Sequence, residues 1–281
     1  MSTAVLDPRL NVYRPDLADV RLKGKVEAAG LVEGWPGQVR VAIANVVAKP
    51  DASAALTTQL LFGETVRVFE IDAEGWAWVQ GDRDGYVGYV SEAAISRTVG
   101  TPTHKIAALS TPAFARPEVK SPPLVDLPMG ALVTVDREID GFAALAIGAF
   151  VPVQHLVPVD ACEADFVAVA TRFVGTPYLW GGRSRAGIDC SGLVQVALQA
   201  AGKSPLRDTD MQQASLGSPV PVEAAQRGDL VYWRGHVGIM TDAATLLHAN
   251  AYHMRVVAEP LAEAVARIKA TGSEVAAVKR V

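Results

Sequence analysis

The stretch from Gly175 to Gly192 reads GTPYLWGGRSRAGIDCSG and runs directly into the apolar sequence LVQVALQAAG. Asp189 is a good helix N-cap residue, so we expect a helix to begin at Cys190 and to stop at Gly202. A thiol in the first turn of a helix lies near the positive end of the helix dipole and near unpaired backbone N–H groups. Both lower its pKa and favour the thiolate. The stretch therefore predicts that Cys190 is a nucleophile, although a buried structural thiol is the commoner fate of a lone cysteine.

Two histidines follow the cysteine, each in an apolar, strand-like run: His236 opens HVGIM and His248 lies in LLHAN. With a tight turn between the strands, both imidazoles can lie side by side on one face of an antiparallel sheet. Catalysis by cysteine needs a base that takes the proton and a third group that orients the base. We therefore predict that His236 is the base for Cys190 and that His248 orients it, with His253 as a weaker rival of His248. By itself, each histidine is as consistent with a structural residue as with a catalytic one.

A zinc site is another use of these residue types, because thiolates and imidazoles are common zinc ligands. The sequence lacks the short C-x-x-C or H-x-x-x-H pairs that pre-form such sites around Cys190 and the histidines. We therefore predict a site without metal and a protein that needs no cofactor.

The motifs YLWGG, DCSGL, GDL, HVGI and LHA occur in this order over about the last 120 residues. Together they resemble the NlpC/P60 cysteine peptidases, papain-like bacterial enzymes, and among them the γ-D-glutamyl-L-diamino acid peptidases of the dipeptidyl-peptidase VI type. The resemblance implies that the partner is a peptidoglycan stem peptide. It also implies cleavage after the γ-carboxyl of D-Glu, before either diaminopimelate or L-Lys.

In related enzymes the positions of Tyr178, Asp189 and Ser191 hold the D-Glu and the start of the peptide. The chemistry fits, because hydroxyl groups can bind a carboxylate and an aspartate suits a free ammonium. Alternatively, Tyr178 packs at the edge of the domain and Asp189 is only an N-cap.

Relatives of this architecture use their first SH3-like domain to close the pocket beyond an unblocked L-Ala. They then release L-Ala-γ-D-Glu from a free N-terminus. The candidates for this wall are Tyr86 or Tyr89, with Asp51 or Glu64 as the partner of the substrate ammonium.

The chain as a whole is predicted to be multidomain: two small all-β SH3-like barrels followed by an α+β papain-like catalytic domain. Short runs of β-forming residues between Gly and Asp turns begin near Val39, and LLFGETV at 60–66 has a counterpart in LPMGALV at 127–133. The expected boundaries are 1–36 for an N-terminal helical segment, 37–97 and 98–159 for the two barrels, and 160–281 for the peptidase. In the last domain we expect helices over 166–173 and 261–269, and strands over 229–232, 236–241, 246–249, 255–257 and 275–280.

The chain has 281 residues, a formal net charge of −4 and a sequence pI near 5.8, without a basic run. These values argue against nucleic acid and anionic membrane partners. No apolar run reaches the roughly 18 residues of a membrane span. The N-terminus lacks the basic start and apolar core of a signal peptide, and two cysteines are too few for a disulfide framework.

We therefore expect a cytoplasmic peptidase of cell-wall recycling. Two alternatives stay open at this point: a secreted hydrolase that acts on intact peptidoglycan, and a wall-binding protein without enzymatic activity.

Overall fold

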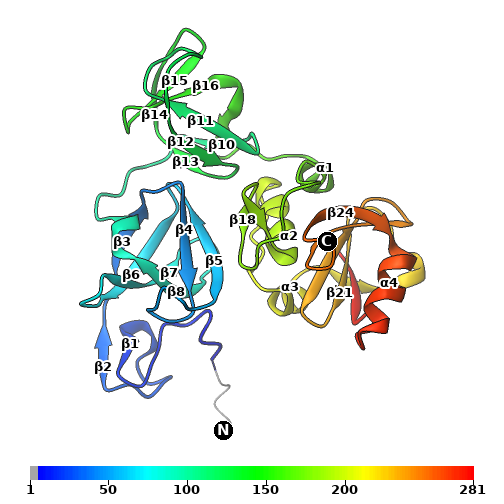
Figure 1. The fold of residues 1–281 in the computed structure, drawn as a ribbon. Coiled ribbons are helices and arrows are strands. Elements are labelled where there is room, and N and C mark those ends of the chain that lie inside the picture. Colours follow the sequence, from blue (N-terminus) through cyan, green and yellow to red (C-terminus); the bar gives the residue numbers. More distant parts are fainter. Residues whose placement is uncertain (1–5) are drawn as a thin grey trace. The chain divides into compact units, whose positions relative to one another are not determined.

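The computed structural model describes residues 6–281 (Figure 1), and the chain divides into two compact units that meet between Val159 and Asp160. In the described range, no helix combines the length and the hydropathy that a membrane crossing requires.

The N-terminal segment is extended, so the predicted helix over 1–36 is wrong for its described part. Strand β1 (Leu17–Asp19) pairs in parallel with β2 (Gly30–Val32), and only a 3-10 turn, η1 (Val20–Leu22), lies between them. The segment also covers an apolar surface of the neighbouring sheet. Its contacts form a small cluster of Val12, Phe69 and Trp78, with Leu17 and Val32 packed against it.

The first β module, residues 35–96, is one seven-stranded sheet in the order β5-β4-β8-β7-β6-β3-β9. Its strands are β3 (Trp35–Val39), β4 (Ile43–Val47), β5 (Leu56–Leu61), β6 (Thr65–Ile71), β7 (Trp76–Gly81), β8 (Val87–Ser91) and β9 (Ile95–Ser96). Alternate residues point inward because successive side chains of a strand face opposite sides of the sheet. The core therefore consists of small and β-branched side chains, among them Val46, Val66, Val68, Ala77 and Val79.

The second β module, residues 104–158, has a five-stranded sheet (β12-β11-β16-β15-β14) and a three-stranded sheet (β13-β10-β17). Its strands are β10 (His104–Ile106), β11 (Ser110–Phe114), β12 (Pro123–Pro128), β13 (Leu132–Val133), β14 (Val135–Ile139), β15 (Phe142–Leu145), β16 (Phe150–Pro152) and β17 (Leu156–Pro158). Its core includes Ile106, Leu127, Leu145 and Val151, and Phe62 of the first module packs against it.

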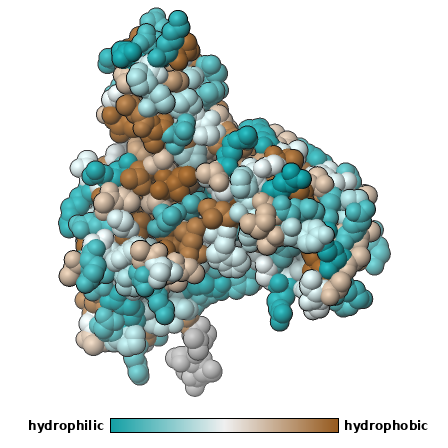
Figure 2. All heavy atoms as spheres, viewed as in Figure 1, coloured by the Kyte–Doolittle hydropathy of each residue, from teal (hydrophilic) through white to brown (hydrophobic). Residues whose placement is uncertain are grey.

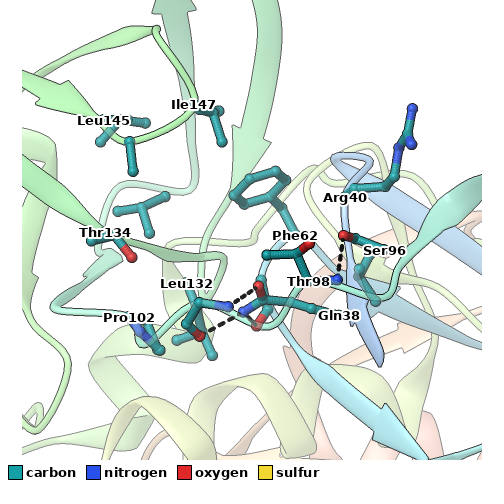
Figure 3. Close-up of a pocket in the computed structure, with 15 residues that line it drawn as sticks. Gln38, Arg40, Phe62, Ser96, Thr98, Pro102, Leu132, Thr134, Leu145 and Ile147 are labelled. Atoms are coloured by element: carbon teal, nitrogen blue, oxygen red, sulfur yellow. Dashed lines mark hydrogen bonds between the residues drawn. The ribbon is translucent and has the colours of Figure 1, made fainter. Parts of the chain in front are cut away.

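The two β modules enclose a cleft of about 370 Å³ (Figure 3). Phe62, Leu132, Leu145 and Ile147 give it apolar walls, and brown, apolar atoms gather where the modules meet (Figure 2). A backbone hydrogen bond joins the two sides of the cleft: the N–H of Leu132 donates to the carbonyl of Phe62 at 2.8 Å. The modules are therefore packed together within this unit.

The C-terminal unit has a six-stranded sheet in the order β20-β25-β21-β22-β23-β24 and four helices. The strands are β20 (Ser218–Val220), β21 (Asp229–Trp233), β22 (His236–Met240), β23 (Thr245–Asn250), β24 (Arg255–Pro260) and β25 (Ala277–Arg280), and a two-stranded ribbon joins β18 (Arg183–Ser184) to β19 (Gly187–Ile188). The helices are α1 (Phe166–Thr171), α2 (Cys190–Ala200), α3 (Thr209–Ser215) and α4 (Leu261–Ala270). Figure 1 shows α2 and α4 on opposite sides of the sheet. The α+β prediction for this region is confirmed, with helices and strands within a few residues of the expected ranges.

Candidate active site

Helix α2 begins where the sequence predicts. Asp189 has extended backbone angles (φ −97°, ψ 178°), and its Oδ1 accepts a hydrogen bond of 2.6 Å from the N–H of Gly192. This is the N-cap geometry that satisfies a free donor of the first turn. Cys190 is thus the first residue of the helix, and its own N–H donates to no group within residues 6–281.

The Cys190 side chain is 6% exposed and lies among hydrogen-bonding groups. Its Sγ is 3.8 Å from Oγ1 of Thr209, and the backbone N–H of Val237 also points at the sulfur. Burial, with a smaller contribution from the negative charge of Asp189, raises the pKa of the thiol to about 11, although the nearby hydrogen-bond donors act in the opposite direction. The prediction of a lowered pKa is therefore wrong for this structure. The sequence showed the helix terminus but not the depth at which the sulfur would be buried.

The two histidines lie together on one face of the sheet, as the strand pattern predicts. The register pairs Ile239 with Leu247 and Met240 with Leu246, which places His236 and His248 on the same side of β22 and β23. Nε2 of His236 is 2.8 Å from Nδ1 of His248. Because Val237 follows His236 and donates to the sulfur of Cys190, the thiol and the imidazole pair belong to one site.

Both imidazoles are neutral at neutral pH. Burial, together with smaller contributions from His248 and Arg267, lowers the pKa of His236 to about 3. Burial also lowers the pKa of His248, against the opposing influence of Glu259. The resting site therefore carries its proton on sulfur and leaves His236 free to accept it.

Sequence reasoning missed two residues behind His248. Oε1 of Glu259 on β24 lies 2.6 Å from Nε2 of His248, and the Arg267 guanidinium on α4 binds both carboxylate oxygens at 2.6 and 2.5 Å. The feature that reveals Glu259 is the register of β23 and β24. It pairs Leu246 with Glu259 and so puts the carboxylate on the same face of the sheet as His248. It could be found only once β23 and β24 were aligned.

The Asp189 carboxylate is held by hydrogen bonds from other residues of the chain. Its two oxygens accept hydrogen bonds from Gly181, Gly192, Ser191 and both terminal nitrogens of Arg207, whose side chain is 1% exposed. A carboxylate with this many donors has no lone pair left for a substrate ammonium. The structure shows the N-cap role of Asp189, and its contact with a substrate stays a prediction.

Ser191 and Tyr178 lie beside the same site. The Ser191 hydroxyl is buried and accepts a 2.8 Å hydrogen bond from Arg207 while it faces Asp189. Burial raises the pKa of the Tyr178 phenol, and the nearby charges of Cys190 and Asp189 raise it further. The phenol is therefore neutral and close to the sulfur, and no residue in 6–281 receives or gives it a hydrogen bond.

The four wall candidates lie in the other unit. Glu64 is 2% exposed, accepts a hydrogen bond from the N–H of Leu61 and pairs with Arg83. Tyr86 is 6% exposed, whereas Asp51 is an exposed turn residue that binds Ser53. The Tyr89 hydroxyl accepts a hydrogen bond of 3.0 Å from the Arg14 guanidinium. Their part in substrate binding remains a prediction.

His253 does not rival His248 in this arrangement, because its Nδ1 lies 3.1 Å from Oδ1 of Asn250 rather than beside His236. Among the residues that the structure describes, no group of three or more His, Cys, Asp and Glu side chains is placed to hold a metal ion.

Comparison with known proteins finds matches in both units of the chain. Residues 175–273 match the NlpC/P60 family, and residues 46–95 match the bacterial dipeptidyl-peptidase SH3 domain. Dipeptidyl-peptidase 6 of Lysinibacillus sphaericus is 26% identical over 231 residues, which cover 74% of this chain and 85% of that protein. Gamma-D-glutamyl-L-lysine dipeptidyl-peptidase of Bacillus subtilis is 29% identical over 217 residues, which cover 69% and 72% of the two chains.

A solved structure shares the fold. The crystal structure of an NlpC/P60 family protein from Bacillus cereus superposes with a TM-score of 0.73 at 20% identity, over 87% of this chain and 99% of that one. With the two sequence matches, this places an SH3-like domain before the catalytic unit. The chain therefore carries an NlpC/P60 peptidase domain over residues 175–273 and a bacterial SH3-like domain ahead of it, over residues 46–95.

Proposed function

We propose that this peptidase hydrolyses the bond between the γ-carboxyl of D-Glu and a diamino acid in peptidoglycan stem peptides, and that it releases L-Ala-γ-D-Glu from free N-termini. The observation that carries the proposal is the single site formed by Cys190, the Val237 N–H and the His236–His248 pair. The Bacillus subtilis relative, named for γ-D-glutamyl-L-lysine cleavage, supports the substrate class because its likeness extends across both units.

In the proposed reaction the proton of the Cys190 thiol passes to Nδ1 of His236 as the sulfur attacks the γ-carbonyl carbon of D-Glu. The unpaired N–H of Cys190 stabilises the oxyanion, a contribution that is typically worth two to three orders of magnitude in rate. His236 then protonates the departing amine, and water hydrolyses the thioester with His236 again as base. Because the resting thiol is neutral, proton transfer accompanies attack rather than preceding it.

We propose that the second β module is a divergent SH3-like barrel. The proposed domain boundaries are 37–97 for the first barrel, 98–159 for the second and 160–281 for the peptidase. The support is a repeated pattern of local structure. In the first module, β8 leads through the 3-10 turn η2 (Glu92–Ala94) into β9, and in the second, β16 leads through η3 (Val153–His155) into β17. The β6–β7 and β14–β15 hairpins also turn at glycines with similar φ, +82° at Gly75 and +79° at Gly141.

We further propose that the enzyme works in the cytoplasm on imported wall fragments. Both cysteines are free thiols, which fits a reducing compartment. Fractionation of cells with an antibody against the native chain tests the location, and recovery in the medium or the wall fraction would favour the secreted alternative.

The decisive experiment is mass spectrometry of the products from L-Ala-γ-D-Glu-L-Lys and L-Ala-γ-D-Glu-diaminopimelate, each with a free and an acetylated N-terminus. We expect L-Ala-γ-D-Glu from the free peptides and far less from the acetylated ones, with Cys190→Ser inactive on all four. Equal cleavage of free and acetylated peptides would indicate an endopeptidase. A fully active Cys190→Ser variant would remove the catalytic assignment.

A further inference from the structure

A chain of hydrogen bonds continues beyond the Cys190, His236 and His248 group. Nε2 of His236 contacts Nδ1 of His248, and Nε2 of His248 contacts Oε1 of Glu259. The Arg267 guanidinium holds both oxygens of Glu259 and lies over the ring of Tyr252 at 4.6 Å. Strands β22, β23 and β24 and helix α4 thus each contribute one member to a line that runs from His236 to Arg267.

The carboxylate of Glu259 determines which ring nitrogen of each histidine carries the proton. An ionised carboxylate can only accept hydrogen bonds, so the 2.6 Å contact to Glu259 requires the proton of neutral His248 on Nε2. Nδ1 of His248 is then an acceptor, and the 2.8 Å contact requires the proton of His236 on its Nε2. This leaves Nδ1 of His236 without a proton, as a general base needs.

A second polar group beside Nε2 of His248 shows what the Glu259 carboxylate prevents. The amide nitrogen of Asn250 lies 3.0 Å from Nε2 of His248, and its oxygen is held in place by the N–H of His253 at 2.8 Å. Without a carboxylate, that amide would donate to Nε2 and move the proton of His248 to Nδ1. The reversed hydrogen bond would put the proton of His236 on the nitrogen that should serve as base.

Arg267 keeps Glu259 in its accepting form. Burial alone would raise the pKa of Glu259, but hydrogen bonds from Arg267 and His248 outweigh burial and lower the pKa. The carboxylate side chain is 10% exposed, and the guanidinium partly neutralises its charge. Glu259 can therefore stabilise an imidazolium without removing its proton.

We propose that Glu259, held by Arg267, is a positioning residue that fixes the tautomers of His248 and His236 so that His236 presents an unprotonated Nδ1 to the Cys190 thiol. The inference rests on the proposed catalytic roles. When Cys190 gives its proton to Nδ1, His236 becomes an imidazolium whose Nε2–H donates to His248. Glu259 balances that charge through His248, and no proton reaches the carboxylate.

Glu259→Gln is the direct test, with Glu274→Gln as the control. Glu274 forms an exposed ion pair with Lys269 in the same unit, so the control makes the same chemical change away from the site. We expect Glu259→Gln to lower kcat about 10- to 1000-fold, the scale seen when a group that orients a catalytic or metal-bound histidine is replaced. KM should change little, and the control should keep wild-type values.

Nitrogen NMR of the imidazoles separates positioning from a general structural effect. We expect His248 to be protonated on Nε2 in the wild type and on Nδ1 in a folded Glu259→Gln variant. Unchanged tautomers together with unchanged kcat would overturn the inference. The NMR measurement needs no substrate, so it tests the positioning role even if the protein cleaves none of the proposed stem peptides.

Arg267→Met provides a second, independent readout. The titratable and charged groups around His248 are His236, Glu259, Arg267 and His253, and this variant removes the one that keeps Glu259 ionised. We expect the acid limb of the kcat/KM profile to move to higher pH, with activity recovering at alkaline pH and with Arg267→Lys near wild type. A loss of equal size at every pH in a folded Arg267→Met variant would contradict the role given to Arg267.

Discussion

At the scale of single residues, the Cys190 thiol and the proposed base His236 are both neutral rather than an ion pair. A helix N-terminus favours a thiolate, but burial of Cys190 and the adjacent Asp189 favour the protonated form and prevail. With the pKa of His236 lowered to about 3, the proton stays on sulfur over the neutral range. A buried, neutral thiol is a weaker nucleophile than a thiolate, so we expect Cys190 to resist alkylation and oxidation at neutral pH.

Alkylation by iodoacetamide tests this state of the thiol. In a Cys162→Ser background, which removes the exposed thiol, we expect the alkylation rate of Cys190 to keep rising with pH beyond 9, because its pKa is about 11. A thiolate–imidazolium pair would instead give a rate that is already maximal near neutral pH. A flat profile from pH 6 to 9 would contradict the neutral pair.

The ion pair of Asp189 and Arg207 is the residue-scale feature on which the fold of the site depends most. Removal of one member of a buried pair leaves the other charge uncompensated, which typically costs about 3–5 kcal/mol. We expect Asp189→Asn to lower the free energy of unfolding by an amount near that range, measured by urea titration. The control is Glu163→Gln, whose partner is Arg172 in a half-exposed pair, and it should change stability by less than about 1 kcal/mol.

At the scale of elements, the turn that precedes β6 sets the contact between the two β modules. Gly63 has a φ of +80°, and a Cβ there would lie 2.1 Å from the carbonyl oxygen of Leu132. A side chain would therefore be strained by the backbone angle and would also push β13 away. No other turn glycine of the first module makes so close an approach to the second.

Paired alanine substitutions separate these two effects. Gly75 has nearly the same φ, +82°, but a Cβ there would meet no atom within 4 Å. We expect Gly75→Ala to cost about 1 kcal/mol, which is the backbone term alone. Gly63→Ala should cost clearly more in the same thermal or urea titration. Equal losses would show that the Gly63 contact with Leu132 relaxes freely.

Local sequence signals predicted some features of the elements, whereas features that depend on contacts between distant residues could not be predicted. The start of α2 at Cys190 and the face shared by His236 and His248 could be predicted, because both depend on local signals: an N-cap and the two-residue period of a strand. The extended N-terminal segment could not, since its conformation depends on packing against Phe69 and Trp78, which are distant in sequence. Glu259 was missed for a related reason, because its contact depends on strand register.

At the scale of the whole molecule, the question is what the N-terminal unit adds to a catalytic unit that already contains Cys190, His236 and His248. The C-terminal unit has a core of its own, with Val231, Trp233, Met240 and Leu246 buried under α4. The proposed catalytic groups all come from α2, β22 and β23. We infer that it can fold and react alone, and that the N-terminal unit contributes specificity rather than chemistry.

A chain limited to residues 160–281 tests this division of labour. We expect it to fold, as judged by circular dichroism, and to alkylate at Cys190 with the pH profile of the full chain. It should also lose the preference for a free N-terminus, because the proposed wall residues Tyr86 and Glu64 belong to the missing unit. The comparison is the ratio of kcat/KM for free and N-acetylated L-Ala-γ-D-Glu-L-Lys in the two proteins. If the folded fragment keeps the ratio of the full chain, the peptidase unit itself selects the free amine. The proposed wall then has no part in that selection.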